Sequence, residues 1–437
     1  MTSSTLSPLR EAESASSPAR RYELDWLRVL IIVGLIPFHV IMLFVVAAQS
    51  YLSGKSPNSA AEIATSFFIL WPISLLFLVA GASTWFALAR RTPGQYMSER
   101  LLRLFFPFVF ATLTLIPLQV YAIVHAYPQL LNMKVVPPTG MHPQESFAEF
   151  YPQYLAGYGY FLRHFSSARE AVFWGHLWFV PRLLLYALAT LPVLLWLRSK
   201  SGMGAIARLA AMFAVPGTTL LLGLMIALPR LGGAALYHLD LRLYGYVNWD
   251  YYSLGSQLVV FLACFLLGYV TYASPPLLRA LHRDGPVALA LGILVFAVLQ
   301  TPAGHFASVT EVTPGGILIT CLRAEGEWLL IAGSLSVALR FFTYSNSLLR
   351  YLSEAAYPLY VLHMPVLILV GVTVVQWHLP IAITLPLVVI ATLALTLGFY
   401  EFAVKRIMPL RLLFGLRARP VKATARGKTH NAPQTPQ

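Results

Sequence analysis

The chain has little charge and almost no cysteine. Only 11% of its 437 residues are charged, and Cys264 and Cys321 are its only cysteines. Cys264 lies inside an apolar run, so a disulfide framework is not expected. The sequence contains no GxxxxGK[ST], no GxGxxG after a strand, no HExxH, no CxxC and no Asp-x-Asp pair. These absences argue against an ATP-driven pump, a zinc protease and a metal-dependent sugar transferase.

Hydrophobic residues, in contrast, make up 58% of the chain, and the mean hydropathy is +0.68. Apolar runs of roughly 17 to 25 residues recur, which is the length that crosses ~30 Å of hydrocarbon. The sequence therefore predicts an all-α, polytopic integral membrane protein with about ten transmembrane helices. The expected spans are 25–48, 66–89, 104–124, 176–197, 206–228, 253–273, 286–302, 327–343, 356–377 and 381–403.

The basic residues lie between these apolar runs rather than on one soluble face. The formal net charge is +14, and most of the 31 lysines and arginines fall on one side if the N-terminus is inside. This pattern predicts that both termini are cytoplasmic in the inner (plasma) membrane, with membrane lipids and not nucleic acid as the partner of the charge. The exceptions, outside or within spans, are Lys55, Lys134, Arg163, Arg169, Arg182, Arg230, Arg242 and Arg323.

Both ends of the chain read as tails. Residues 1–23, rich in Ser, Ala and Pro, predict a disordered cytoplasmic tail, and residues 418–437 predict a basic one; residues 24–417 form the membrane domain. The alternative hypothesis is a signal peptide cleaved after Ala48. It is disfavoured because the apolar run is long and contains Pro37 and His39. The aromatic outer loops 125–175 and 229–252 are expected on the outer surface, either anchoring the protein or touching substrate.

The first span carries Arg28 and His39. Eleven residues are about three helical turns, so the two side chains share one stripe, ~16 Å apart. His39 at mid-membrane is predicted to be the catalytic base of an acyl transfer, and Arg28 could hold the phosphates of a thioester donor. The alternatives are an Arg28 that reaches the headgroups and a hydrogen-bonded core histidine.

Two more pairs are candidate donor ligands near the inner side. Arg100 and Arg103 are three residues apart, share a helix face and could bind donor phosphates, unless they serve topology alone. Tyr360 and His363 lie in the ninth span, with His363 expected ~13 Å deep, near the level of Arg28 or a little beyond. They predict a polar inner pocket, with helix packing as the alternative.

Three residues near the outer side are candidate acceptor ligands. His176 and Trp178 open the fourth span and could bind a sugar, although tryptophan at an interface is often an anchor. Glu327, at the outer mouth of the eighth span, could orient an acceptor hydroxyl or simply pair with Arg323.

Taken in order, these stretches resemble the membrane acyltransferase-3 family. The resemblance rests on DWLR with the Arg28-x10-His39 spacing, HLWF at His176, YPLYVLH ending at His363, and FYEFAVKRIMPLRLLFGL, and it covers nearly all of 22–417. It implies about ten helices and transfer of an acetyl- or succinyl-type group from cytoplasmic acyl-CoA to a hydroxyl of an outer-face glycan or lipid-linked sugar. The glucan-modifying branch is the most similar.

By that resemblance His39 is the catalytic histidine, Arg28 its motif partner, and Arg100 with Arg103 the family's arginine pair. No permanently bound cofactor and no metal are expected. A transporter or flippase of a glycan or lipid intermediate would also explain the buried ionisable groups, so it stays as the second hypothesis. A membrane scaffold would leave the mid-membrane histidine without a purpose.

Overall fold

The structure is a computed structural model that describes residues 20–42, 59–126, 144–163, 173–238, 254–301 and 313–417. All regular secondary structure in these ranges is helical. Nearly all of both predicted tails, the alternative cleavage site after Ala48 and much of the two outer loops lie outside the described residues. The first helix begins at Tyr22, slightly before the predicted start of the membrane domain.

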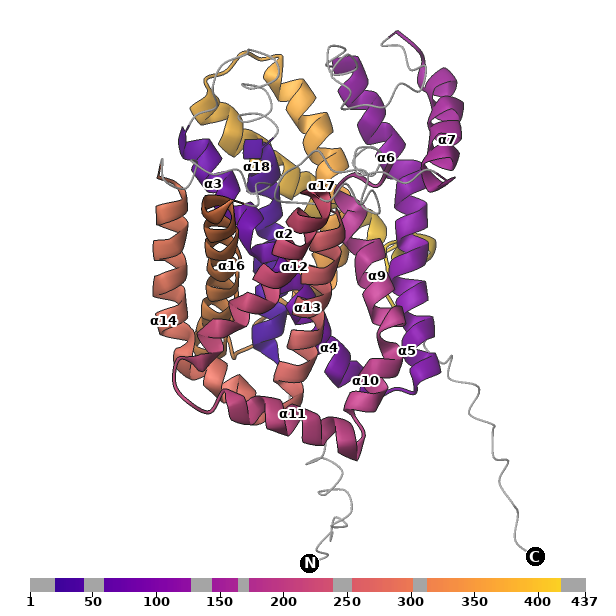
Figure 1. Cartoon of the computed structure of the whole chain (residues 1–437). Helices are drawn as coiled ribbons and strands as arrows, with labels where there is room; N and C mark the ends of the chain where they lie inside the picture. Colours follow the sequence, from indigo (N-terminus) through magenta and orange to yellow (C-terminus); the bar gives the residue numbers. More distant parts are fainter. Residues whose placement is uncertain are drawn as a thin grey trace, which may run out of the picture.

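The helices of the first half lie on both sides of the bundle (Figure 1). They are α2 (Tyr22–Ile41), α3 (Ser59–Leu70), α4 (Pro72–Leu88), α5 (Pro93–Arg100), the π-helix η2 (Leu101–Phe105), α6 (Phe106–Ala126), α7 (Phe147–Arg163), the 3-10 helix η4 (Gly175–Trp178), α9 (Phe179–Ala189) and α10 (Leu191–Leu197). In Figure 1, α6 and α7 lie to the right and α3 to the left.

The second half completes the bundle. Its helices are α11 (Lys200–Met212), the 3-10 helix η5 (Thr218–Gly223), α12 (Leu224–His238), α13 (Leu254–Ala273), α14 (Pro275–Leu299), α16 (Pro314–Phe341), α17 (Ser347–Val375), α18 (Ile381–Phe399), the π-helix η7 (Tyr400–Val404) and α19 (Met408–Leu413).

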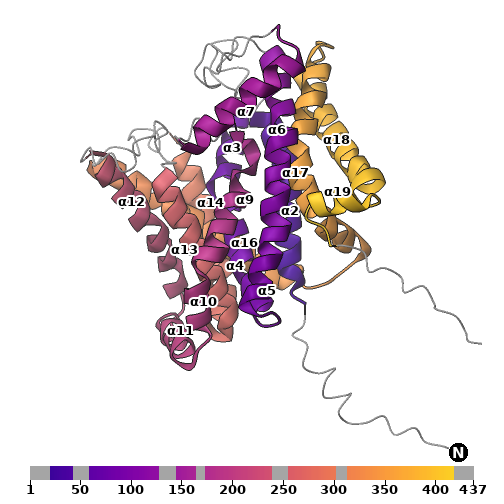
Figure 2. The ribbon, with the colours of Figure 1, turned by 90° about the vertical axis from the view of Figure 1, so that its right-hand side faces the viewer.

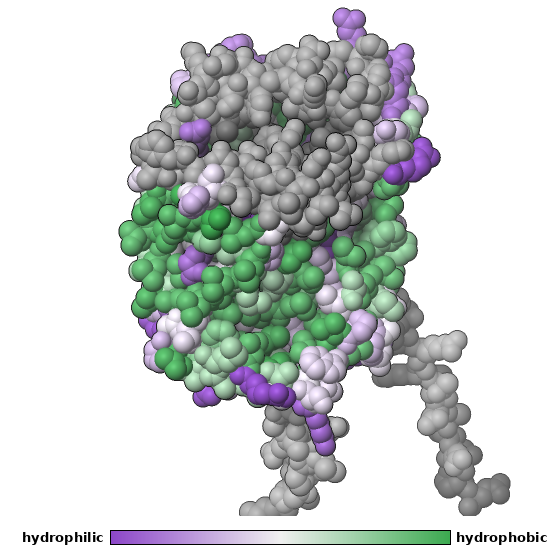
Figure 3. All heavy atoms as spheres, viewed as in Figure 1, coloured by the Kyte–Doolittle hydropathy of each residue, from purple (hydrophilic) through white to green (hydrophobic). Residues whose placement is uncertain are grey.

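Six described helices are long and apolar enough to cross a membrane, or seven if the pair Gly175–Ala189 and Leu191–Leu197, bent by 53°, is one span. Two shorter apolar helices, Thr218–Gly232 and Gln257–Ala273, accompany them. The α16 helix is long as well, but it carries charged residues near its middle. On the face shown in Figure 3, hydrophobic side chains form a broad band across the described part of the molecule, with hydrophilic ones at its lower rim and at the upper right. This is the surface of a bundle embedded in lipid.

The bounds of the expected fifth span, 206–228, are wrong. Helix α11 ends at Met212, and Gly217, with φ 84°, precedes η5 and the rising helix α12. In Figure 1, α11 lies across the lower end of the bundle. The reason is its pattern, because Gly202, Ile206 and Ala210 are buried at four-residue spacing while Arg208 is exposed. Such a helix covers the end of a bundle instead of crossing the bilayer.

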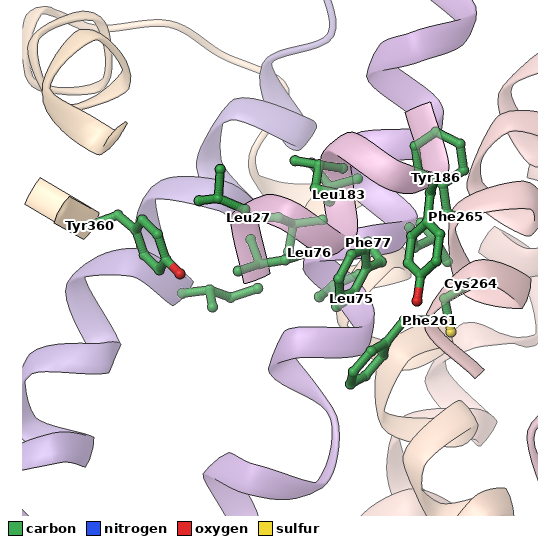
Figure 4. Close-up of a cluster of buried hydrophobic side chains, with 14 of the residues drawn as sticks. Leu27, Leu75, Leu76, Phe77, Leu183, Tyr186, Phe261, Cys264, Phe265 and Tyr360 are labelled. Carbon is green, nitrogen blue, oxygen red and sulfur yellow. The ribbon is translucent and has the colours of Figure 1, made fainter. Parts of the chain in front are cut away.

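The core joins helices that are far apart in the sequence. Figure 4 shows Phe77 of α4 beside Phe261 of α13, whose ring centroids are 4.7 Å apart, with Leu27 of α2 and Tyr360 of α17 in the same cluster. Lipid gives helices no hydrophobic reason to associate, so close contact of small residues matters more than in water. The α4–α13 pair follows this rule: a Cβ on Gly268 would lie 1.9 Å from the carbonyl oxygen of Leu78.

The two ends of the described chain meet at the same end of the bundle. The Tyr272 hydroxyl, at the end of α13, contacts Glu23 near the start of α2, and its ring lies 5.9 Å from that of Phe86 at the end of α4. Helix α5 follows α4 directly, and its Glu99 pairs with Arg417 at 3.3 Å. We call this the basic end, because Arg20 before α2, Arg91 before α5, Arg283 of α14 and Arg411 of α19 lie in the segments that meet there.

The crossing of α4 and α13 makes a packing prediction. Gly268→Ala should lower the free energy of unfolding by about 1–3 kcal/mol, because the added methyl has to push two backbones apart. Gly204→Ala in α11 is the matched control, since a Cβ there meets nothing within 4 Å. Thermal unfolding of the purified protein in detergent measures both variants. Equal unfolding temperatures would contradict the close packing.

Candidate functional site

Three histidines from three separate segments meet inside the bundle. They are His39 of α2, His176 of η4 and His363 of α17, which we call the histidine cluster. The ring centroids of His39 and His363 are 5.2 Å apart, and those of His176 and His363 are 4.9 Å apart. His363 Nε2 lies 3.3 Å from His39 Nδ1. His363 is therefore the central ring of the cluster.

The starting points of two helices bring His39 and His363 to one level. Helix α17 begins at Ser347, where the Asn346 side chain accepts a 2.7 Å hydrogen bond from the Leu349 amide. His363 thus lies 16 residues into α17 and His39 17 residues into α2, each ~25 Å from its helix start. Trp26 of α2 donates to the Tyr344 carbonyl just before α17, so both helices rise from the same end.

The prediction that His363 lies near the level of Arg28 is consequently wrong. It counted about nine residues from a span that enters the membrane just after Ser353, whereas the Asn346 cap starts the helix at Ser347. The signal that could have given the correct start is Asn346, because asparagine is a preferred N-cap residue and an uninterrupted helical pattern follows it.

The prediction that His176 lies near the outer surface is wrong, because the residue lies inside the bundle. Its side chain is buried, and its Nε2 lies 3.2 Å from the Val361 carbonyl oxygen. The Tyr360 hydroxyl donates to the His176 carbonyl. Gly175, with φ 50°, turns the chain toward α17 at this point, where Ile116 leaves little room for a side chain. The 3-10 turn thereby brings His176 and Tyr360 into one site.

Carbonyl contacts decide which nitrogen of each ring carries its proton. His363 Nδ1 lies 2.8 Å from the Tyr360 carbonyl and His39 Nδ1 2.9 Å from the Leu35 carbonyl. A carbonyl oxygen only accepts, so we assign the proton to Nδ1 in both neutral rings. His363 Nε2 is then an acceptor that faces the Nδ1–H of His39. The Nε2 of His39 is left with its lone pair, and the side chain is only half-buried.

His176 has the opposite arrangement. Its Nε2 donates to Val361, so Nδ1 carries the lone pair, and this buried atom has no hydrogen-bond partner among the described residues. Within the same described part of the chain, no group of three or more His, Cys, Asp or Glu is arranged to hold a metal ion. The cluster thus offers two basic nitrogens, one on His39 and one on His176, rather than a ligand set.

Arg28 lies on the same continuous helix as His39. Its guanidinium donates to Asp25 at 2.9 Å, and the side chain is 38% exposed. The Nε atom is buried and has no hydrogen-bond partner in the described residues. One terminal nitrogen of the guanidinium is therefore paired with Asp25, while the buried Nε lacks an acceptor among the described residues.

Arg100 and Arg103 flank the start of the π-helix η2 at the basic end. The Arg100 guanidinium lies 4.9 Å from the centre of the Tyr96 ring, and Arg103 pairs with Glu99 at 3.4 Å. Each arginine contacts the residue four positions before it, so the two guanidinium groups have different partners one turn apart.

The other two predicted acceptor ligands make contacts within the protein. The Trp178 ring stacks on Phe261 at 5.8 Å, and the Arg182 guanidinium lies 4.3 Å from its centre. Glu327 is buried, bonding Arg230 of α12 at 2.6 Å and the Ser74 hydroxyl of α4 at 2.5 Å. The sequence did not indicate Ser74 as a partner of Glu327. It did contain a signal for Arg230, because a lone arginine in an apolar run has to be paired inside the protein.

The buried Glu327–Arg230 pair yields a stability prediction. Glu327→Leu or Arg230→Met alone should each destabilise the protein by about 3–5 kcal/mol, because each leaves one buried charge unpaired. The double variant should recover most of that loss. Chemical or thermal unfolding of the four proteins forms a double-mutant cycle. Additive losses in the double variant would show that the two charges do not depend on each other.

The site can now be compared with known proteins. Residues 21–401 match the family model of the acyltransferase-3 domain, described as an acyltransferase domain. No curated protein and no solved structure matches the chain. The match covers most of the sequence and contains the whole histidine cluster, together with Arg28, Arg100 and Arg103. The chain therefore belongs to the acyltransferase-3 family and is a membrane acyltransferase, an enzyme that transfers groups other than aminoacyl groups.

Proposed function

We propose that the protein moves an acyl group from acyl-CoA to a hydroxyl of an outer-face glycan or lipid-linked sugar, with His39 as the general base. The observation that carries the proposal is the hydrogen bonding of His39. Its Nδ1 faces the Leu35 carbonyl and His363 Nε2, which leaves Nε2 of a half-buried ring to accept a proton.

The proposed transfer conserves atoms and protons with His39, the acceptor hydroxyl and the thioester as the reacting groups. His39 Nε2 takes the proton of the acceptor hydroxyl while its oxygen forms a bond to the thioester carbonyl carbon. The carbon–sulfur bond breaks as the tetrahedral intermediate collapses, and the proton passes from His39 to the departing thiolate. His363 Nε2, together with the Leu35 carbonyl, holds the Nδ1–H of His39 and steadies the imidazolium that forms in between. Direct transfer and a route through an acylated residue both fit this arrangement.

The donor is proposed to enter from the basic end, which we take as cytoplasmic. Phosphate groups would meet Arg28, Arg100 and Arg103, since guanidinium groups bind phosphate oxygens through paired hydrogen bonds. Tyr360 and His363 would then flank the thioester near His39 rather than the phosphates. The proposal has about ten crossings with both termini inside, in the plasma membrane. It is supported by the two described chain ends meeting at one end of the bundle.

The acceptor is proposed to reach the cluster from the opposite end. His176 is the predicted acceptor ligand that shares the cluster, and its unpaired Nδ1 can accept a hydrogen bond from a sugar hydroxyl. Trp178 and Glu327 would act through packing around that approach. An acetyl- or succinyl-type group on a glucan is the substrate pair that the family resemblance favours.

His39→Gln is expected to reduce acyl transfer by about 10²–10⁴-fold, because glutamine keeps much of the shape of the ring but cannot take up a proton. The measurement is mass spectrometry of envelope glycans and lipids from cells with the wild-type or variant gene, where one acyl group appears as a fixed mass step.

The control is His378→Asn, at an exposed turn with φ 52° that asparagine tolerates. It should keep the wild-type mass step, and both variants should unfold at the wild-type temperature. A folded His39→Gln protein that still adds the acyl group would remove His39 as the base.

A further inference from the structure

The C-terminal part of the chain folds back onto the basic end after α18. Residues 408–417, which we call the C-terminal strap, comprise α19 and the turn at Gly415. Figure 2 shows α19 beside α18, on the side of the bundle where α17 and α6 run. The buried Arg411 fixes its shape by donating to the carbonyls of Lys405 at 3.0 Å and Arg417 at 3.1 Å. The strap follows the end of the family match at residue 401.

One face of the strap is buried against the bundle, at Arg411, Phe414 and Leu416. Phe414 is 2% exposed, and its ring meets the Phe110 ring of α6 edge-on at 5.8 Å. A Cβ on Gly415, where φ is 70°, would lie 2.8 Å from the Arg103 carbonyl oxygen and 2.9 Å from the Tyr357 ring. Gly415 thus lies between Arg103, the predicted donor arginine, and Tyr357 of α17. Tyr357 is only six residues (~9 Å) before His363 along that helix.

The last residue of the strap joins a cluster of charges around Glu99. This one carboxylate pairs with Arg91 at 2.6 Å, Arg103 at 3.4 Å and Arg417 at 3.3 Å. One negative charge cannot neutralise three guanidinium groups, so the cluster has a surplus of positive charge. Its arginine side chains are 28%, 40% and 68% exposed, in the same order. A ligand with several phosphate oxygens matches that surplus better than a single carboxylate does.

We propose that Arg417 of the strap and Arg91 join Arg103 in binding the phosphates of the donor nucleotide. This inference rests on the proposed function, since it concerns the site at which acyl-CoA would bind. Glu99 holds the three guanidinium groups together before the donor arrives, which lowers the cost of ordering them. The strap is then a wall of the donor site, and Gly415 is the residue that lets it approach Arg103 and Tyr357 closely.

The test is binding of CoA, and of adenosine 3′,5′-bisphosphate as its thiol-free part, to the full-length protein in nanodiscs by calorimetry. Arg417→Ala should weaken both ligands about tenfold, the effect of losing one charged hydrogen bond. Arg417→Lys should lose less, because it keeps the charge but not the paired donors. Arg350→Ala, an exposed arginine at the start of α17, is the control with the same change in net charge.

A second pair of variants tests the strap without touching a charge. Gly415→Ala should weaken binding of both ligands to a similar extent, because the methyl group collides with Arg103 and Tyr357. Gly398→Ala in α18 is its control, since a Cβ there meets nothing within 4 Å. Unfolding temperatures without ligand show whether each variant is folded.

Failure of this inference and failure of the proposed function look different. If wild-type protein binds CoA but Arg417→Ala and Gly415→Ala bind it as well as their controls, the strap has no part in the donor site. If the wild-type protein binds neither ligand, acyl-CoA is not the donor and the proposed function falls with it. Since His39 lies beyond the phosphates, His39→Gln should bind CoA normally while losing transfer.

Discussion

A polar group inside a lipid-embedded bundle has to find its partner within the protein, and this constraint shapes the site. Each ring of the histidine cluster meets this demand with a backbone carbonyl: Leu35 for His39, Tyr360 for His363 and Val361 for His176. These bonds do more than offset the cost of burial. They place the protons on the rings, and so they determine that His39 keeps a basic Nε2 and His176 a basic Nδ1. The chemistry of the site follows from how its burial is satisfied.

Helix α17 connects the parts of this enzyme. Tyr357, Tyr360 and His363 repeat every three residues along it, and each contacts a different segment of the chain. The Tyr357 ring meets the strap at Gly415, the Tyr360 hydroxyl meets the His176 carbonyl, and His363 meets His39. A line of aromatic rings thereby runs from the basic end to the histidine cluster, with ring centroids of Tyr357 and Tyr360 6.4 Å apart.

This line of aromatic rings is supported by the helices α4, α12, α13, α14 and α16. The α4–α13 and α14–α16 pairs approach closely at glycines, among them Gly268 and Gly333, where a Cβ would meet the neighbouring helix at 1.9 Å and 2.7 Å. The buried pair of Glu327 and Arg230 ties α16 to α12, and Ser74 adds α4. Close packing and a desolvated ion pair both resist movement. The helices that carry the site residues, α2 and α17, are therefore supported by a rigid part of the bundle.

The amino-acid sequence by itself determined the class of this protein. Apolar runs long enough to cross hydrocarbon required an all-helical membrane bundle, and the eleven-residue step from Arg28 to His39 placed both on one stripe of α2, because helical period and bilayer thickness are local properties. Tertiary structure decided which residues meet. The sequence put His176 at the outer surface and His363 at the level of Arg28, whereas the Asn346 cap, the turn at Gly175 and the packing of α17 bring both to His39. Glu327 likewise pairs with an arginine 97 residues away. Hydropathy and charge patterns record how deep a segment lies but not which helix faces which, since that choice depends on side-chain shape across contacts distant in the sequence.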